Sequence, residues 1–408
     1  MAWVEQHGGG FRVRARAAGR VYTDSVHAAR TGAAARAEEL TGQERTRRDG
    51  IAEQVRQARA ASARSRLGPD PTLGAWAAHW STTLAVTEVT RANYECYLRV
   101  HILPRFGHTP LSLIGRSDVK AWAVGLRARY MPSTVTSITA VLSALLADAA
   151  RERLIPVNPC HYLRLGPRRT RPQPIATPAQ IHAIAARMPR TEALLVITAA
   201  YTGMRWGELA GLHRDNVVLD PPGSRVVPHL RVDPDLGALH EVAGRLWLGP
   251  PKTESSERIV VLPRFLTQLL AAHLAEHPHR FVFTGRDGGH LRRGAFRARF
   301  WLPALAGDPE HPDPDRRGPV CAGMTFHRLR HAHKTWMIED GIPEIAQYAR
   351  LGHRTPGVAA RYAHPTYVMW HRLLQALQTR WQHAASTDDT QGQVQAAELM
   401  GDTQLAAA

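Results

Sequence analysis

The first segment of the chain alternates bulky and basic residues, a pattern that predicts β-strands. Residues 11–16 follow a period of two, typical of a strand with one buried face. The turn Ala18-Gly19-Arg20 leads to a second strand at residues 21–23, and Trp3-Val4 supply a third. A helix rich in Ala and Arg is expected over residues 27–66. Alternation would place Phe11, Val13 and Ala15 on the inner face of the sheet and Arg12, Arg14 and Arg16 on the outer face.

The next segment has helical periodicity. The linker Gly68-Pro69-Asp70-Pro71 precedes it, and four helices are expected within residues 72–165. Their signals are Trp76 and Trp80 on one face of the first helix, Thr90 and Leu103-Pro104 at the ends of the second, Ser117-Asp118 capping the third, and Pro132 and Arg153 at the ends of the fourth. These features predict a small all-α domain.

A Pro-rich linker at residues 166–174 carries Arg168, Arg169 and Arg171, which can follow a phosphate backbone or simply join two domains. The third domain, residues 175–382, mixes helices with a β-hairpin. Its strands are expected at residues 246–248 and 259–262, with Lys252 in the turn. Residues 383–408 read as a polar, Ala-rich tail. The predicted fold class is therefore multi-domain, mainly α with small β-sheets.

The charge balance adds a candidate partner. The 408 residues include 52 Lys and Arg against 35 Asp and Glu, a net charge of +17. A chain this basic is expected to meet a polyanion, most often nucleic acid, and the basic outer face of the N-terminal sheet suits DNA. Compositional drift in a GC-rich genome and a merely solvated strand face are the alternatives, because only three basic residues are Lys.

The cysteines and the apolar runs bear on the compartment. Three widely spaced cysteines form no disulfide framework. No apolar run is expected to reach the roughly 18 residues of a membrane helix, and the N-terminus lacks the apolar core of a signal peptide. We therefore expect a cytoplasmic protein.

Four short stretches of the third domain carry candidate chemistry. Arg205 is expected to open a helix after Gly203, and Glu208 on the same face can hold its guanidinium, although such a pair alone can equally be structural. Lys252 is one of the three lysines, and an ammonium can give up a proton whereas a guanidinium effectively cannot. The remaining candidates are His327, Arg330 and His331 on one helix face, His353 after Leu351-Gly352, and Tyr362 on a helix begun by Thr355-Pro356.

Together these residue types suit cleavage of a phosphodiester. Two arginines and two histidines can neutralise the charge of a pentavalent transition state. A tyrosine can form a covalent phosphotyrosine link with DNA, and a lysine can protonate the departing sugar oxygen. No carboxylate cluster calls for a metal and no phosphate-binding loop calls for ATP, so no cofactor is expected. Zinc binding by His327, His331 and His333 is a weaker alternative.

The four stretches, in this order, resemble the tyrosine recombinase (phage integrase) family. The matching motifs are Thr-Gly-Met-Arg-x-x-Glu, Pro-Lys-Thr-x-x-Ser, His-x-x-Arg-His, Leu-Gly-His and the terminal Tyr. The resemblance implies catalytic roles for Arg205, Lys252, His327, Arg330, His353 and Tyr362, supported by Glu208 and His331. It covers residues 175–370, with residues 72–165 similar to a core-binding domain and residues 1–66 similar to an arm-type DNA-binding domain.

The resemblance implies an integrase of a phage or integrative element that acts as a homo-tetramer on double-stranded DNA. An excisionase and a DNA-bending accessory protein would be possible partners. A type IB topoisomerase-like enzyme and a non-catalytic DNA-binding regulator on the same fold are the alternatives. Among other tyrosines, Tyr367 is the serious rival to Tyr362 as nucleophile.

Overall fold

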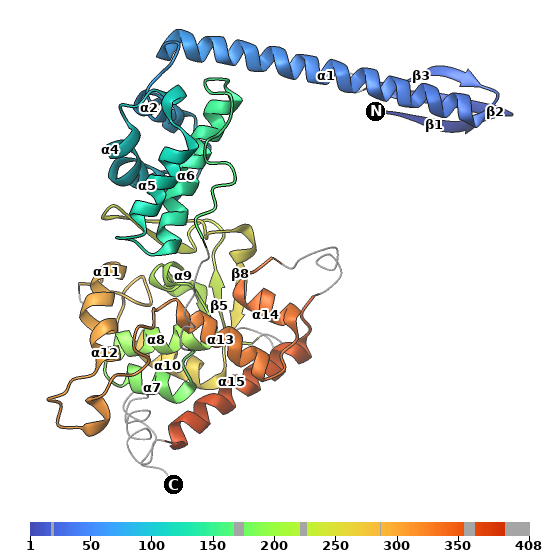
Figure 1. The fold of residues 1–408 in the computed structure, drawn as a ribbon. Coiled ribbons are helices and arrows are strands. Elements are labelled where there is room, and N and C mark those ends of the chain that lie inside the picture. The colour runs from blue at the N-terminus through green and yellow to red at the C-terminus, as the bar shows by residue number, and fades with distance from the viewer. Residues whose placement is uncertain (18–19, 167–174, 221–226, 286, 355–363, 388–408) are drawn as a thin grey trace. The chain divides into compact units, whose positions relative to one another are not determined.

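The computed structural model describes the chain except residues 18–19, 167–174, 221–226, 286, 355–363 and 388–408 (Figure 1). The expected turn at Ala18-Gly19, the linker arginines Arg168, Arg169 and Arg171, and Tyr362 lie wholly or partly outside the described residues. The chain divides into two compact units, Met1–Thr170 and Arg171–Ala408.

The first unit begins with an antiparallel sheet and a long helix. The strands β1 (Ala2–His7), β2 (Gly10–Ala17) and β3 (Arg20–His27) pair in sequence order, and α1 spans Arg30–Leu67. The inward positions Val13 and Ala15 are buried, and Val13 packs with Ala33 and Ala37 of α1. On the opposite side of β2, Arg12 and Arg14 lie 3.0 and 4.0 Å from the carboxylate of Glu5. The predicted sheet, helix and alternation are confirmed here.

Helices form the rest of the first unit. They are α2 (Leu73–Thr83), α3 (Glu88–Tyr97), a π-helical turn at Leu98–Ile102, α4 (Leu103–Phe106), a 3-10 turn at Leu111–Leu113, α5 (Arg116–Leu126) and α6 (Pro132–Arg151). Trp76 and Trp80 are buried on one face of α2, as predicted. Their indole N–H groups donate to Leu145 O at 2.9 Å and Asp148 Oδ2 at 2.7 Å on α6, so both rings are buried with a satisfied donor.

Three predicted helix limits are wrong in this unit. The second helix begins after Thr87, whose hydroxyl accepts from Thr90 N, and the π turn carries it past Pro104 to Phe106. Pro104 is accommodated because it stands in the first turn of α4, where a missing N–H is tolerated. The third helix is capped at Gly115, and Asp118 assists by accepting from Gly115 N at 3.2 Å.

Helix α6 is more apolar than the sequence analysis allowed. Its 20 residues include a window with mean hydropathy 1.4, which by length and composition alone would suit a membrane span. The expectation that no such run exists is therefore wrong. In the structure Ile138, Leu142, Leu145 and Leu146 are buried against the other helices of this unit, and we interpret α6 as their core helix.

The second unit surrounds one buried helix, α8 (Arg190–Thr202), which contacts α7, α10 and α13. Every residue of α8 from Ala193 to Thr202 is buried. Its other helices are α7 (Pro178–Ala185), α9 (Trp206–Ala210), α10 (Arg264–Ala275), α11 (Arg293–Phe296), a π turn at Arg297–Trp301, α12 (Leu302–Ala306), α13 (Arg328–Glu339), α14 (Glu344–Leu351) and α15 (Tyr367–Thr387). Residues 383–387, expected in the tail, continue α15. Three 3-10 turns lie at Arg214–Asn216, Glu254–Ser256 and Pro314–Arg316.

The strands of the second unit correct the predicted hairpin. One sheet has the order β4 (Val217–Val218), β5 (His229–Val232), β8 (Arg258–Val261), and β6 (Ala238–Val242) pairs with β7 (Arg245–Gly249). Thus β7 and β8 are both strands, as predicted, but they do not pair with each other. The Ala243-Gly244 turn between β6 and β7 has φ values of 49° and 81°, the combination of a tight two-residue hairpin turn. Lys252 consequently lies in the connection between two sheets.

Candidate active site

Arg205 is positioned by the sharp end of α8. Gly203 has φ 68°, and a Cβ there would lie 2.7 Å from Leu351 Cδ2 and 2.8 Å from His333 Cδ2. Glycine is therefore required both for the left-handed backbone and for close packing. The chain then starts α9, with Arg205 at its N-cap. Glu208 Oε2 accepts from Arg205 N at 2.9 Å, and Oε1 accepts from Arg205 Nη1 at 2.7 Å.

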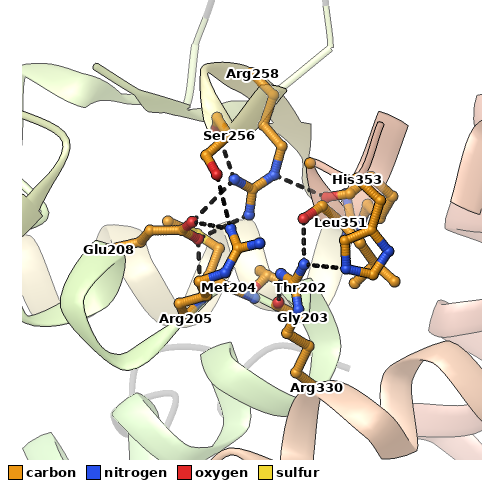
Figure 2. A network of polar contacts seen from close by, with 12 residues as sticks. Thr202, Gly203, Met204, Arg205, Glu208, Ser256, Arg258, Arg330, Leu351 and His353 are labelled. Carbon is orange, nitrogen blue, oxygen red and sulfur yellow. Dashed lines mark hydrogen bonds and ion pairs between the residues drawn. The ribbon is translucent and has the colours of Figure 1, made fainter. Parts of the chain in front are cut away.

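Glu208 is the buried centre of a larger ion-pair network (Figure 2). Its side chain is 2% exposed and also accepts from Arg258 Nη2 at 2.8 Å and Nη1 at 3.2 Å. Burial raises the pKa of Glu208, but the charges of Arg258 and Arg205 outweigh burial and leave the pKa below its ordinary value. The carboxylate is therefore ionised at neutral pH and fixes both guanidinium groups.

Arg258 is a site residue that the sequence analysis missed. It begins β8, only two residues after the Ser of the Pro-Lys-Thr-x-x-Ser motif. The motif also gains a structural reason, because Ser256 Oγ accepts from Arg205 Nη1 at 3.0 Å and lies 2.9 Å from Thr253 Oγ1. These bonds attach the segment that carries Lys252 to Arg205.

Arg330 lies on α13, and its side chain contacts the turn at Gly203 that precedes Arg205. Its side chain is buried and its Nη1 donates to Gly203 O at 2.6 Å, while Nη2 donates to Leu351 O and to His353 Nε2, the latter at 3.0 Å. Burial, followed by the charge of Arg205, lowers the pKa of Arg330 to about 9, so the guanidinium is still charged at neutral pH. Because a guanidinium only donates, His353 must accept through Nε2 and is neutral in this contact.

His327 stands at the N-terminal end of α13, and its ring lies edge-on to His331 with centroids 5.3 Å apart. Partial burial and neighbouring positive charges lower the pKa of both histidines. His327 also lines a cavity of about 530 Å³ together with Arg205, Glu208 and Lys252. The structure thus brings three of the predicted basic residues to one cavity, beside the Arg330–His353 pair.

The structure does not assign the other predicted site residues to this cavity. Tyr362 is outside the described residues, so its place near the cavity stays a prediction. Tyr367 begins α15 and lines a separate apolar groove with Ile259 and Val261. Arg12, Arg14 and Arg16 belong to the first unit. Among the described residues, no group of three or more His, Cys, Asp or Glu could hold a metal ion, and His333 is buried inside the second unit.

The sequence of this chain is similar to a family of known proteins. Residues 176–368 match the model of the phage integrase family. The integrase of Mycobacterium phage L5 is 26% identical over 298 residues, which are 71% of this chain and 74% of that protein. The phiRv2 prophage integrase of Mycobacterium tuberculosis is 28% identical over 303 residues, which are 72% of this chain and 75% of that protein.

Solved structures share the fold. The Tn1549 transposon integrase in complex with a circular intermediate DNA has a TM-score of 0.59 at 19% identity, covering 75% of this chain and 99% of that chain. A lambda integrase tetramer bound to a Holliday junction has a TM-score of 0.51 at 16% identity, covering 90% and 98%. The mainly helical architecture with small sheets is therefore that of the tyrosine recombinase integrases.

The Arg330–His353 contact predicts a pH dependence of stability. Partial burial and the charges of Arg330 and Arg205 lower the pKa of His353 from 6.5 to about 4. Between these values the unfolded chain binds more protons, so the stability that neutral His353 contributes is complete above pH 6.5 and is lost as the pH falls toward 4.

The measurement is the free energy of unfolding in urea across this range, for the wild type and for His353→Gln. Glutamine keeps an acceptor for Arg330 but does not titrate. We expect the wild type to lose more stability than the variant on acidification, because other histidines titrate equally in both proteins. Parallel curves for the two proteins would show that His353 is not held neutral by this contact.

Proposed function

This chain belongs to the phage integrase family through residues 176–368, and we propose that it is a site-specific DNA recombinase, the integrase of a phage or integrative element. The observation that carries the proposal is the pairing of two arginines from distant segments, Arg205 in the lining of the cavity and Arg330 beside it. Arg205 is held by buried Glu208, and Arg330 by Gly203 O and His353. Two fixed guanidinium groups close to each other, one of them in the cavity lining, suit a phosphodiester rather than a neutral substrate.

We assign the bond changes as follows. Tyr362 gives up its phenol proton to solvent, and its phenolate oxygen attacks the phosphorus, forms a 3′-phosphotyrosine link and displaces the 5′ oxygen of the next nucleotide. Lys252, which lines the cavity, protonates that leaving oxygen. A 5′-hydroxyl from the exchanged strand then gives its proton back to Lys252, attacks the phosphotyrosine and releases the tyrosine as a phenolate. The phosphotyrosine bond conserves the energy of the broken phosphodiester, so rejoining requires no ATP.

The arginines and histidines stabilise the transition state in this scheme. Arg205 and Arg330 neutralise the charge that grows on the two non-bridging oxygens. His327 faces the same cavity and donates to the phosphate, with His331 packed against its ring. Neutral His353 orients Arg330 by accepting from Nη2 at its Nε2, which leaves its Nδ1–H to donate to the phosphate.

We assign DNA-binding roles to both parts of the first unit. The helices α2–α6 act as the core-binding domain and the sheet β1–β3 as the arm-type domain, with Arg12, Arg14 and Arg16 toward DNA. Arg168, Arg169 and Arg171 in the linker follow the phosphate backbone. Four protomers join two duplexes in the cytoplasm, assisted by an excisionase and a DNA-bending protein. The mass of the complex formed on a synthetic four-way DNA junction tests this assembly. We expect it to equal the mass of four protomers plus the junction.

Covalent trapping tests the nucleophile. Wild type, Tyr362→Phe and Tyr367→Phe are mixed with nicked duplexes tiled across the DNA that flanks the gene, then denatured and separated on a gel. We expect a denaturation-resistant protein–DNA band with the wild type and Tyr367→Phe, and none with Tyr362→Phe. A band that persists in Tyr362→Phe and is lost in Tyr367→Phe would move the nucleophile to Tyr367. Salt-sensitive binding without any covalent band favours the non-catalytic regulator, and supercoil relaxation without strand joining between duplexes favours a topoisomerase.

A substrate with altered leaving group tests the general acid. Lys252→Ala should slow single-turnover cleavage by about 10²–10⁴-fold, because the departing alkoxide is no longer protonated. Replacing the bridging 5′ oxygen with sulfur should bring the rate of Lys252→Ala to within about tenfold of the wild-type rate on the same substrate, because a thiolate leaves without a proton. Arg330→Ala serves as the control and should remain slow on both substrates. Equal slowing of Lys252→Ala on both substrates would assign Lys252 to binding alone.

Replacement of three arginines tests the arm-type assignment. The full chain with Arg12→Ser, Arg14→Ser and Arg16→Ser should lose at least about tenfold in affinity for sites away from the crossover, because phosphate and base contacts from the sheet are removed. Covalent band formation at the crossover duplex should be unchanged. Footprinting of the flanking DNA measures both effects. An unchanged footprint in the triple variant would show that the sheet does not bind these sites.

A further inference from the structure

Arg350 is the most deeply buried arginine that the chemistry above leaves without a task. It lies in the last turn of α14 with 0% of its surface exposed. Its Nη2 donates to Tyr201 O at 2.9 Å, its Nη1 donates to Val261 O, and its Nε donates to His333 Nε2 at 3.3 Å. All three acceptors are neutral, so this buried charge is held by hydrogen bonds without a carboxylate among the described residues. Such an arrangement is costly unless each bond is made.

The three acceptors belong to the three elements that deliver the site arginines. Tyr201 O closes the last turn of α8, just before Gly203 and Arg205. Val261 O ends β8, the strand that begins with Arg258. His333 lies on α13, one turn after Arg330. A single guanidinium therefore joins elements that are otherwise far apart in the sequence.

The backbone around Arg350 makes a second set of connections to the same arginines. Arg350 O accepts from Arg258 Nε at 2.9 Å, and the next carbonyl, Leu351 O, accepts from Arg330. Gly352 then turns with φ 63°, so close to the Lys252 segment that a Cβ would lie 2.8 Å from Ser255 O. The end of α14 therefore contacts Arg258, Arg330 and the segment that carries Lys252, and His353 follows it immediately in the sequence.

The protonation states of Arg350 and His333 decide which of the two donates the hydrogen bond. Burial, followed by the charge of Arg258, lowers the pKa of Arg350 to about 9, which still leaves it protonated at neutral pH. Burial and the charges of Arg350 and Arg330 keep the pKa of His333 well below 6.5, so its Nε2 carries a lone pair. Arg350 donates, and His333 accepts.

We propose that Arg350, hydrogen-bonded to His333, is a positioning residue that sets the distances between Arg205, Arg258 and Arg330. It thereby shapes the phosphate-binding site that these arginines form, which we call the phosphate cradle. This inference rests on the proposed function, because the cradle is assigned to a phosphodiester there. Arg350 touches no reacting atom. A misplacement of about 1 Å in such a cradle costs on the order of a hundredfold in rate, so small shifts of α14 are expected to matter.

The test compares Arg350→Met with a matched control in the full chain. Arg214 also donates to three carbonyls of the second unit, Leu274 O at 2.9 Å, His279 O at 3.2 Å and His277 O, but it contacts none of the site residues. Arg214→Met therefore removes a comparable set of bonds. Both variants are measured for melting temperature, DNA affinity and single-turnover formation of the covalent band.

We expect Arg350→Met to slow band formation at least about tenfold beyond Arg214→Met, with DNA affinity within about twofold of the wild type. Arg350→Lys, which can bond both carbonyls, should recover part of the rate. Equal rates in Arg350→Met and Arg214→Met at equal loss of melting temperature would overturn the proposal. Loss of DNA affinity in proportion to rate would overturn it as well.

Tungstate binding separates this inference from the proposed function. This oxyanion resembles a phosphate group and needs no DNA cleavage. It should raise the melting temperature of the wild type and Arg214→Met but not of Arg350→Met. If the wild type cleaves no DNA, the proposed function fails, and the tungstate result still decides whether Arg350 shapes the cradle.

A gentler variant covers the case in which Arg350→Met does not fold. His333→Leu removes only the acceptor of Nε and keeps both carbonyl bonds of Arg350, whereas His333→Gln retains an acceptor. We expect His333→Leu to lose several-fold in rate and in tungstate response, and His333→Gln to retain both. Identical behaviour of the Leu and Gln variants would overturn the role of His333 in positioning Arg350.

Discussion

The buried carboxylate of Glu208 is the interaction on which the site depends. It stands between two guanidinium groups, Arg205 at 2.7 Å and Arg258 at 2.8 Å, in a place where water reaches only 2% of its surface. Removing one partner from a buried ion pair costs about 3–5 kcal/mol, because the remaining charge loses both water and its counterion. Two cations of like charge can therefore share this small volume only because the anion between them is fixed.

The arrangement explains why the second unit buries so many arginines. A guanidinium offers five donors in a plane, and Arg258, Arg330 and Arg350 each use that plane to join backbone carbonyls from different elements. An ammonium group could satisfy fewer of them and in no fixed direction. Lys252 is the exception that fits this logic, because its role in the proposed chemistry is to give up a proton.

Local patterns in the sequence were sufficient for the parts of the site that are local. The three-residue spacing of Arg205 and Glu208 predicts their pairing, and Gly203 predicts the sharp end of α8. The alternation of residues 11–16 likewise predicts the buried face of β2. In each case the interacting residues are neighbours along the chain.

Long-range pairings were not accessible in this way. Arg258 meets Glu208 across 50 residues and Arg350 meets Tyr201 across 149, and no periodicity connects such positions. The predicted hairpin was wrong for a similar reason: β7 and β8 both read as strands, but the positive φ of Ala243, which turns β7 back onto β6, leaves no clear signal in a non-glycine residue. Tyr362 stays a prediction from its spacing to His353.

These separations also have a consequence during synthesis. Arg330 reaches Gly203 across 127 residues, and Arg350 and His353 follow later still. A nascent chain that has emerged only through α10 holds Arg205, Glu208, Arg258 and Lys252 but lacks α13 and α14, the two helices that close the network. Because these elements follow later in the chain, the first unit, to which we assign DNA binding, leaves the ribosome well before the proposed cleavage centre is complete. The order of the elements along the chain therefore places completion of that centre near the end of translation of the second unit.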